Sequence, residues 1–244
     1  MDFDLSSEQT QLKDGVERLV SARYGSLEAR RAQGAGALGF SEATWSQFAE
    51  MGLFGIPFSE EEGGFGGGPV ETLVVMEALG RGLVLEPYLA TVVLGGGAVR
   101  LGGSAALKQR VIPGIVDGSM RLALAFTERQ SRYDLADVAT TARRSGDDYV
   151  LDGAKSVVVN GDSAQHLVVS ARISGDRRDR DGIGLFLVPA DAPGVRVHGY
   201  ATQDGGRAAE IALSGVSVGE DALIGPAGEV VTTGTCLVPI AIGP

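Results

Sequence analysis

Apolar residues recur at helical spacing through the first half of the chain. The first such segment follows Ser6 and Gln9, whose spacing is that of a capping box. Its apolar side chains repeat every three or four positions, at Leu12, Val16, Leu19 and Val20. The pattern predicts an amphipathic helix that begins directly after Ser6.

Two further helices follow. Ser41 can cap the first of them, which stops near Gly52. Its apolar face holds Trp45, Phe48 and Ala49. Pro69 suits the first turn of the second. The apolar residues of that segment are Val70, Leu73, Val74, Val75, Met76, Ala78 and Leu79. Because they leave little polar surface, we expect this helix to be buried on most sides.

Glycine clusters mark two positions in this helical half. Pro87 opens a fourth predicted helix and Ser104 a fifth, which runs into Pro113. The triplet 95–97 interrupts the fourth helix, where each glycine costs about 1 kcal/mol relative to alanine. Close approach of a neighbouring helix is the expected compensation. The second cluster, at 60–69, lacks the Lys-Ser/Thr of a phosphate-binding loop, so we interpret it as a connecting loop.

After residue 119 the apolar pattern changes from helical to strand-like. Eight short runs, rich in β-branched residues, are separated by Gly, Asp and Asn turns. They read RLALAF, VATTARR, DYVLDG, KSVVVNG, QHLVVSARI, GIGLFLVPA, VRVHGY and AAEIALSGVSV. Their nearly regular spacing predicts an antiparallel sandwich or barrel. We expect an α+β multidomain protein, with a helical domain at 1–118, a middle β domain at 119–229 and a tail at 230–244.

Composition and charge exclude several classes of function. The net charge is −10, and no basic stripe is interleaved with aromatic residues, so nucleic-acid binding is not expected. No apolar run approaches the ~20 residues that span a bilayer, and the N-terminus is too acidic for a secretory signal. The single cysteine, Cys236, cannot form an internal disulfide. We therefore expect a cytoplasmic protein.

The sequence contains few candidate residues for a metal site or for hydrolysis. The only histidines, His166 and His198, fall in predicted strands, and a single cysteine cannot complete a zinc site with them. The chain has no G-x-S-x-G motif for a nucleophilic serine. Cys236 lies far in sequence from both histidines, so a thiol nucleophile is not expected.

The stretch AFTERQSRYDL, at 125–135, places Thr-Glu and a polar turn directly after an apolar run. Such a turn can hold a ligand or can be an ordinary exit from a strand. Its context favours a ligand, because the order of segments resembles the acyl-CoA dehydrogenase family from residue 1 to about 229. The segments that carry the resemblance are GSAALKQRVIPGIVDG, LAFTE, YVLDGAK, LFLVPADAPGVRV and AAEIALSGVSVGEDALIG. Within the family, TERQSRYDL, GGFGGGPVET and PYLATVVLGGG look most like the small subunit of two-component pimeloyl-CoA dehydrogenases.

The resemblance implies a desaturation that uses FAD. In the family, a carboxylate base takes the α-proton of an acyl-CoA thioester and a hydride passes to the flavin. Thr127 corresponds to the threonine that hydrogen-bonds the flavin, with Phe126 beside it. Glu128 is expected to be structural, and Asp134 to close the loop through local backbone hydrogen bonds. The implied partners are an acyl-CoA substrate, a large acyl-CoA dehydrogenase subunit and an electron-transfer flavoprotein.

Two departures from the family pattern affect this site. Where the family commonly has Trp-Ile-Thr packed on the flavin, this chain has Val157, Val158 and Val159. Tyr133 stands where the family has a small serine that touches the acyl-CoA, and Arg129 replaces a proline. A phenol at Tyr133 is expected to fill space meant for the thioester chain.

The end of the sequence departs further. Family members continue from GPAGE into a second helical domain that carries the catalytic carboxylate, whereas residues 230–244 here are rich in β-branched residues. We therefore expect the base to lie outside these 244 residues. A frameshift or premature stop is the simplest explanation, and a genuine two-domain protein is the alternative.

Three functions stay open from the sequence. The first is a FAD-dependent acyl-CoA dehydrogenase, as an incomplete small subunit. The second is a non-catalytic partner subunit of a heteromeric acyl-CoA dehydrogenase, which Tyr133 and the three valines favour. The third keeps the scaffold but changes the reaction, as in flavin monooxygenases and oxidases of this fold.

Overall fold

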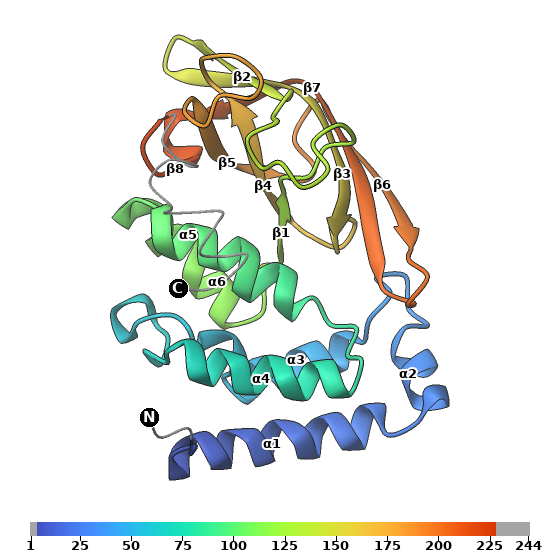
Figure 1. The fold of residues 1–244 in the computed structure, drawn as a ribbon. Helices are drawn as coiled ribbons and strands as arrows, with labels where there is room; N and C mark the ends of the chain where they lie inside the picture. The colour runs from blue at the N-terminus through green and yellow to red at the C-terminus, as the bar shows by residue number, and fades with distance from the viewer. Residues whose placement is uncertain (1–3, 228–244) are drawn as a thin grey trace. The chain divides into compact units, whose positions relative to one another are not determined.

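The computed structural model describes residues 4–227, which form two compact units (Figure 1). The first unit holds the chain up to Leu89 together with Val116–Gly118. The second holds Ala90–Ile115 and, among the described residues, the chain from Ser119 onward. The expected tail at 230–244, with Cys236, lies outside the described residues.

Four α-helices build the first unit, and side-chain caps begin three of them. They are α1 (Ser7–Tyr24), α2 (Leu27–Gln33), α3 (Glu42–Glu50) and α4 (Pro69–Arg81), with short 3-10 turns at Leu53–Gly55 and Glu60–Glu62. The capping box at Ser6 is confirmed, because the Ser6 hydroxyl accepts from the Gln9 amide and the Gln9 side chain accepts from the Ser6 amide. Ser41 caps α3 and Pro69 occupies the first turn of α4, both as predicted.

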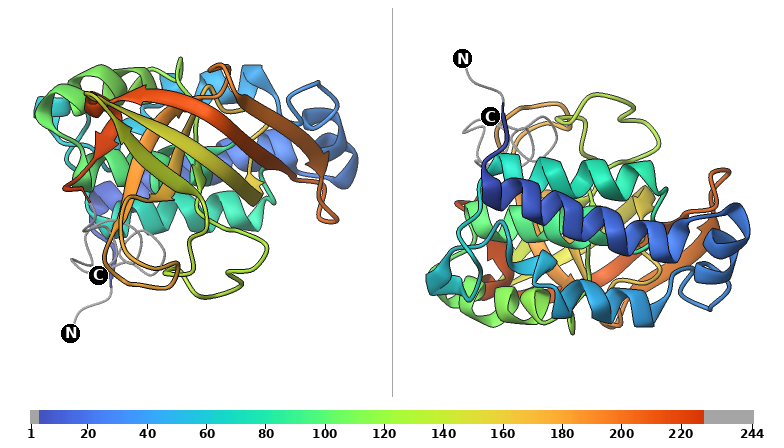
Figure 2. Two further views of the ribbon diagram at one scale, coloured as in Figure 1. Left: turned by 90° about the horizontal axis from the view of Figure 1, so that it is seen from above. Right: turned by 90° about the horizontal axis from the view of Figure 1, so that it is seen from below.

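An aromatic cluster forms the core of the first unit. The rings of Trp45 and Phe54 lie 4.1 Å apart between centroids, and the Phe48 and Tyr88 rings pack around Phe54. The Trp45 indole N–H donates to the Gly118 carbonyl at 2.8 Å, which holds the returning segment against α3. Figure 2 shows α1 lying along α4, where Val16 and Val20 are buried.

One prediction for this unit was wrong, and one helix was missed. The helix α4 is not buried on most sides, because Leu73 is 65% exposed and Val70 is 43% exposed, while only the face with Val74, Val75, Ala78 and Leu79 is buried. The helix α2 was not predicted at all. Its sequence, LEARRAQ, has one large apolar residue and buries none of its side chains, so it carries no apolar stripe to detect.

The fourth predicted helix takes an unusual form in the second unit. Residues Leu89–Gly96 form a π-helix that continues into α5 (Gly97–Gly102), and α6 (Ala105–Val116) follows. A Cβ built on Gly95 would lie 2.5 Å from the Cβ of Leu122, in strand β1 (Leu122–Ala125). The expected close neighbour of the glycine triplet was a helix, and at Gly95 it is this strand. Pro113 does not end the fifth helix, because α6 continues through it to Val116.

Gly95 and Gly80 make a matched pair for testing this packing. Gly80 lies in α4, and a Cβ added there would meet nothing within 4 Å, so Gly80→Ala is expected to raise the free energy of unfolding by up to about 1 kcal/mol. Gly95→Ala is expected to lower it by roughly 1–3 kcal/mol, because the new methyl group overlaps Leu122. Urea denaturation of both variants measures the difference, and equal effects would contradict the close approach at Gly95.

One mostly antiparallel sheet dominates the second unit (Figures 1 and 2). Its other strands are β2 (Thr141–Ser145), β3 (Asp148–Val159), β4 (His166–Arg172), β5 (Ile183–Pro189), β6 (Val195–Ala201), β7 (Arg207–Gly219) and β8 (Leu223–Ile224). The order is β6-β7-β3-β2-β4-β5-β8, and β1 pairs parallel with β4. The predicted combination of a helical region and a mostly antiparallel β region is confirmed.

Strand β3 matters most for the candidate site, because two predicted runs merge in it. DYVLDG and KSVVVNG form one strand that pairs with β7, and the pairing register shifts between Leu151 and Gly153 and again between Lys155 and Val158. These irregularities are β-bulges, which change which face of the sheet a side chain meets. Beneath them, Tyr149, Leu151 and Phe186 belong to the buried core of the sheet.

Candidate functional site

The segment that follows β1 is fixed against β3. Phe126 and Thr127 leave the strand half-buried, and Glu128 turns into the interior. The Thr127 carbonyl accepts a hydrogen bond from the Ser156 amide at 2.8 Å. Thr127 is therefore held beside the second bulge of β3.

The bulge turns two of the three valines outward. Val157 is 54% exposed and Val159 is 44% exposed, whereas Val158 is buried in the core of the sheet. Val157 has a φ of +53°, a left-handed conformation that is uncommon for a β-branched residue and costs roughly 1–3 kcal/mol. Backbone strain of this kind persists only where surrounding contacts enforce it, and it is frequent at ligand sites.

Glu210 of β7 supports the strained residue. Its carboxylate accepts from the Ser156 hydroxyl at 2.8 Å and from the Val157 amide at 3.4 Å. The Tyr200 hydroxyl donates to the same carboxylate at 3.3 Å. Burial and the neighbouring Glu210 charge raise the pKa of Tyr200, so the phenol remains a donor at neutral pH. The carboxylate thus satisfies an amide that the bulge would otherwise leave unpaired.

We name Phe126, Thr127, Val157 and Val159, with the backbone of Val158, the flavin-facing surface, after the cofactor that the family resemblance implies for these positions. It combines exposed aliphatic side chains with a half-buried hydroxyl beside a strained backbone segment. A planar, largely apolar ring system with hydrogen-bonding edges fits such a surface, since the apolar area packs on the ring and the hydroxyl can bond its edge. The side chain of Val158 faces the core and cannot contact a ligand there.

Glu128 is buried directly behind this surface. One carboxylate oxygen accepts from the Lys155 ammonium at 2.7 Å and from the Thr140 amide at 3.1 Å. The other accepts from Gln130 and from the Ala139 amide, at 2.6 and 2.9 Å. Burial alone would raise the pKa of Glu128, but the Lys155 charge and these donors outweigh it and lower that pKa to about 2. A carboxylate so held is structural, as the sequence predicted, and is a poor proton acceptor.

Lys155 is the cationic partner of this pair. Its side chain is fully buried, and the ammonium also donates to the Ser170 hydroxyl at 2.9 Å. Burial lowers the pKa of Lys155 to about 8, although the attraction of Glu128 acts in the opposite direction. Both members of the pair are charged at neutral pH.

The polar loop after Glu128 closes on itself. The Asp134 side chain accepts from the Ala136 amide at 3.0 Å, so the expected local role of this residue is confirmed. Tyr133 is fully exposed. That its ring fills the acyl space stays a prediction. Arg129 is also exposed, with its guanidinium 3.9 Å from the Glu210 carboxylate.

Sequence reasoning missed the two residues that organise the site from behind. A lysine in a strand run is ordinarily a surface residue, and Lys155 appeared only as part of a motif match. Glu210 appeared only within the run AAEIALSGVSV. The sequence signal that could have identified Lys155 and Glu210 was their charge, because a charged residue in an otherwise apolar strand needs a specific partner.

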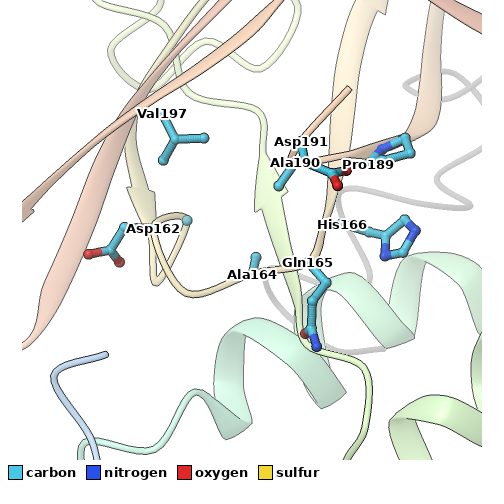
Figure 3. A pocket seen from close by; sticks show the side chains of 9 residues that line it. Asp162, Ala164, Gln165, His166, Pro189, Ala190, Asp191 and Val197 are labelled. Carbon is cyan, nitrogen blue, oxygen red and sulfur yellow. The ribbon is translucent and has the colours of Figure 1, made fainter. Parts of the chain in front are cut away.

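A separate hollow of about 480 Å³ opens elsewhere in the second unit (Figure 3). Its lining includes Asp162, Gln165, His166, Asp191 and Val197, none of which belongs to the flavin-facing surface. Burial lowers the pKa of His166, so this imidazole is neutral at pH 7. Within residues 4–227, no group of three or more His, Cys, Asp or Glu side chains could hold a metal ion. Across the same residues, no helix has the length and apolar character needed to cross a membrane.

Comparisons with known proteins agree with this architecture. Residues 6–119 match the acyl-CoA dehydrogenase N-terminal domain and residues 123–216 match the acyl-CoA dehydrogenase middle domain. The probable acyl-CoA dehydrogenase YngJ of Bacillus subtilis is 29% identical over 231 residues, which cover 92% of this chain and 60% of that protein.

Two solved structures are also similar. The Tcur3481-Tcur3483 steroid ACAD G363A variant has a TM-score of 0.79 and 32% identity, over 90% of this chain and 57% of that one. The FAD complex of PigA has a TM-score of 0.84 over 94% of this chain and 61% of that one, and at 24% identity it supports the fold alone. The chain thus spans about 60% of the length of these relatives. Because the two domain families together match most of its residues, the chain belongs to the acyl-CoA dehydrogenase family.

Proposed function

We propose that this chain binds FAD on the flavin-facing surface and takes part in the α,β-desaturation of an acyl-CoA thioester. The observation that carries the proposal is the backbone hydrogen bond from Ser156 that holds Thr127 beside the outward-facing, strained Val157. Family membership supports it, as does a fold shared with a protein solved as an FAD complex.

The residues present fit a flavin in three respects. The Thr127 hydroxyl can donate to the edge of the ring, Val157 and Val159 can cover one of its faces, and Phe126 can pack beside it. When bound, FAD supplies the hydride acceptor of the reaction. The protein's own part is to orient the ring, and we propose that Tyr133, on the adjoining loop, contacts the acyl group.

Neither of the two carboxylates next to this surface, Glu128 and Glu210, is suited to take the proton. Glu128 is buried and paired with Lys155, while Glu210 accepts from Ser156 and Tyr200. A base needs an accessible carboxylate with a pKa near the working pH. We therefore propose that a partner subunit or a further segment supplies it, and that this chain acts as the small subunit of a heteromeric enzyme.

A non-catalytic partner subunit is the second candidate. Val157 and Val159 offer neither the aromatic ring nor the hydroxyl that the family commonly places on the flavin. Tyr133, which is fully exposed, stands where the family has a small serine. In this case the chain would shape and stabilise a flavoprotein subunit without holding FAD. The similar solved structure, the Tcur3481-Tcur3483 steroid ACAD, has two components in its name, and this supports a two-subunit arrangement for either candidate.

Flavin binding and turnover separate the candidates. We expect the purified chain to carry substoichiometric FAD, because only one side of the ring is covered, and to bind added FAD in a fluorescence titration. Thr127→Val keeps the shape of the side chain and is expected to weaken that binding about tenfold, the equivalent of one hydrogen bond. Thr141→Val, in β2, is the matched control and should leave FAD affinity unchanged.

Activity provides the second measurement. With FAD and pimeloyl-CoA, the lone chain should not reduce a dye acceptor, and turnover should appear only with a complete large subunit. Steady dye reduction by the lone chain would contradict the need for a partner. Full activity of the complex after Thr127→Val, with no FAD bound by the isolated chain, would instead favour the non-catalytic subunit.

A further inference from the structure

The flavin-facing surface is made of two segments that are distant in sequence. Phe126 and Thr127 follow β1, whereas Val157 and Val159 lie in the bulge of β3. The direct backbone link between these segments is the hydrogen bond from the Ser156 amide to the Thr127 carbonyl. A single hydrogen bond contributes little net stability, so it is a weak tether for two segments that must share one ligand.

The buried pair behind the surface is a second tether between the same segments. Glu128 directly follows Thr127, and Lys155 directly precedes Ser156, so each charge sits one residue from the backbone hydrogen bond. The two side chains meet at 2.7 Å, with 3% and 0% of their surface exposed. Ser170 of β4 accepts from the same ammonium, which adds a third element to the junction.

The carboxylate also organises the loop beyond it. Glu128 accepts from the amides of Ala139 and Thr140 and from the Gln130 side chain, and the Ser131 hydroxyl accepts from the Glu128 amide. This loop carries Tyr133, the proposed acyl contact. The same junction therefore sets the position of the loop, of Thr127 and of the bulge.

We propose that Lys155 is a positioning residue for flavin binding, whose buried ammonium fixes the Thr127 segment against the Val157 bulge through Glu128 and Ser170. This inference rests on the proposed flavin binding. Ligand contacts must be held within about 0.5 Å of their productive geometry, and residues behind a site supply that precision. Lys155 touches no ligand itself, since its side chain lies beneath the sheet surface.

The variant Lys155→Met tests the role of the ammonium, because methionine fills similar space without a charge or a donor. We expect FAD affinity to fall at least tenfold, with the protein still folded by circular dichroism. Val188→Ala, a truncation in the buried part of β5, is the control for general destabilisation and should leave FAD affinity within twofold of wild type. The double variant Glu128→Gln with Lys155→Met removes both charges. It should bind FAD as weakly as Lys155→Met does, even if it is more stable than Lys155→Met.

A second readout does not depend on flavin. Hydrogen exchange at the Ser156 amide reports the link between the two segments directly. In Lys155→Met we expect this amide to exchange at least tenfold faster relative to the amides of β4 and β5, and in Val188→Ala we expect no selective change. Unchanged Ser156 protection in a folded Lys155→Met protein would overturn the inference.

The outcomes separate the inference from the proposed function. A wild-type chain that binds no FAD overturns the proposed function, and with it the flavin role of Lys155. A wild-type chain that binds FAD, with equal affinity in Lys155→Met, overturns the role of Lys155 alone. An equal loss of affinity in Val188→Ala also overturns it, because the effect would then follow from stability.

Discussion

Glu128→Ala is expected to lower the free energy of unfolding by roughly 3–5 kcal/mol, among the largest effects of a single substitution in this chain. The variant leaves the Lys155 ammonium buried with only the Ser170 hydroxyl as an acceptor. It also strips the amides of Ala139 and Thr140 of their carboxylate acceptor. A buried charge without its partner costs far more than the pair contributes, because its desolvation is no longer offset.

Two controls isolate the charge. Glu128→Gln keeps the shape and a carbonyl acceptor, so we expect an intermediate loss. Arg143→Met breaks an ion pair with Asp152 in which the arginine side chain is 73% exposed and the aspartate side chain 40%, so it should change stability by less than about 1 kcal/mol. Urea denaturation of the three variants gives the ranking. A loss for Glu128→Ala no larger than that for Arg143→Met would contradict the importance of the buried pair.

The same carboxylate gives the protein an acid-dependent stability. Because the pKa of Glu128 is lowered to about 2, the folded state holds fewer protons than the unfolded state below about pH 4.5. The contribution of this group is therefore complete above pH 4.5 and is lost as the pH falls toward 2. The loss is on the order of 3 kcal/mol, and Glu128→Gln should remove that part of the pH dependence.

The sequence predicted the parts of the fold that carry a periodic pattern. Ser6, Ser41 and Pro69 each combine a start signal with an apolar stripe, and the helices begin where those signals predict. The helix α2 has a cap at Ser26 but no stripe, so nothing in its pattern separates it from a loop. The helix α4, in contrast, has many apolar residues, and these wrongly predicted burial on most sides. Hydrophobicity shows that Leu73 could be buried, but it does not show that another element packs on it.

The candidate site was predictable only in part, because bulges and buried charges depend on tertiary partners. The motif around Thr127 and the valine triplet located both segments of the surface. It could not show that Val158 turns inward, since that follows from the register shift between Lys155 and Val158. Nor could it show that Lys155 and Glu128, 27 residues apart, form the junction between those segments.

Substitution of Arg172 is expected to have the second large effect on stability. Unlike Lys155, this buried cation bonds backbone carbonyls and not a carboxylate. Its guanidinium is buried at the end of β4 and donates to four main-chain oxygens, those of Ala136, Arg177, Asp179 and Asp181. Desolvation lowers the pKa of Arg172, opposed by the acidic residues around it, but an arginine remains charged at neutral pH. Four charge-assisted hydrogen bonds thus join the loop after Glu128 to the connection between β4 and β5.

Arg172→Met is expected to lower the free energy of unfolding by roughly 2–4 kcal/mol, less than four full hydrogen bonds because water can reach some of the freed carbonyls. Both loops should also become more sensitive to limited proteolysis, with cleavage at 173–182 appearing before cleavage in the sheet. Arg178→Met is the matched control: Arg178 is largely exposed, and its buried partner Asp137 keeps a second ion pair with Arg177, so the loss should be less than about 1 kcal/mol. If Arg172→Met and Arg178→Met unfold at the same urea concentration and are cut at the same rate, the four carbonyl contacts do not hold these loops together.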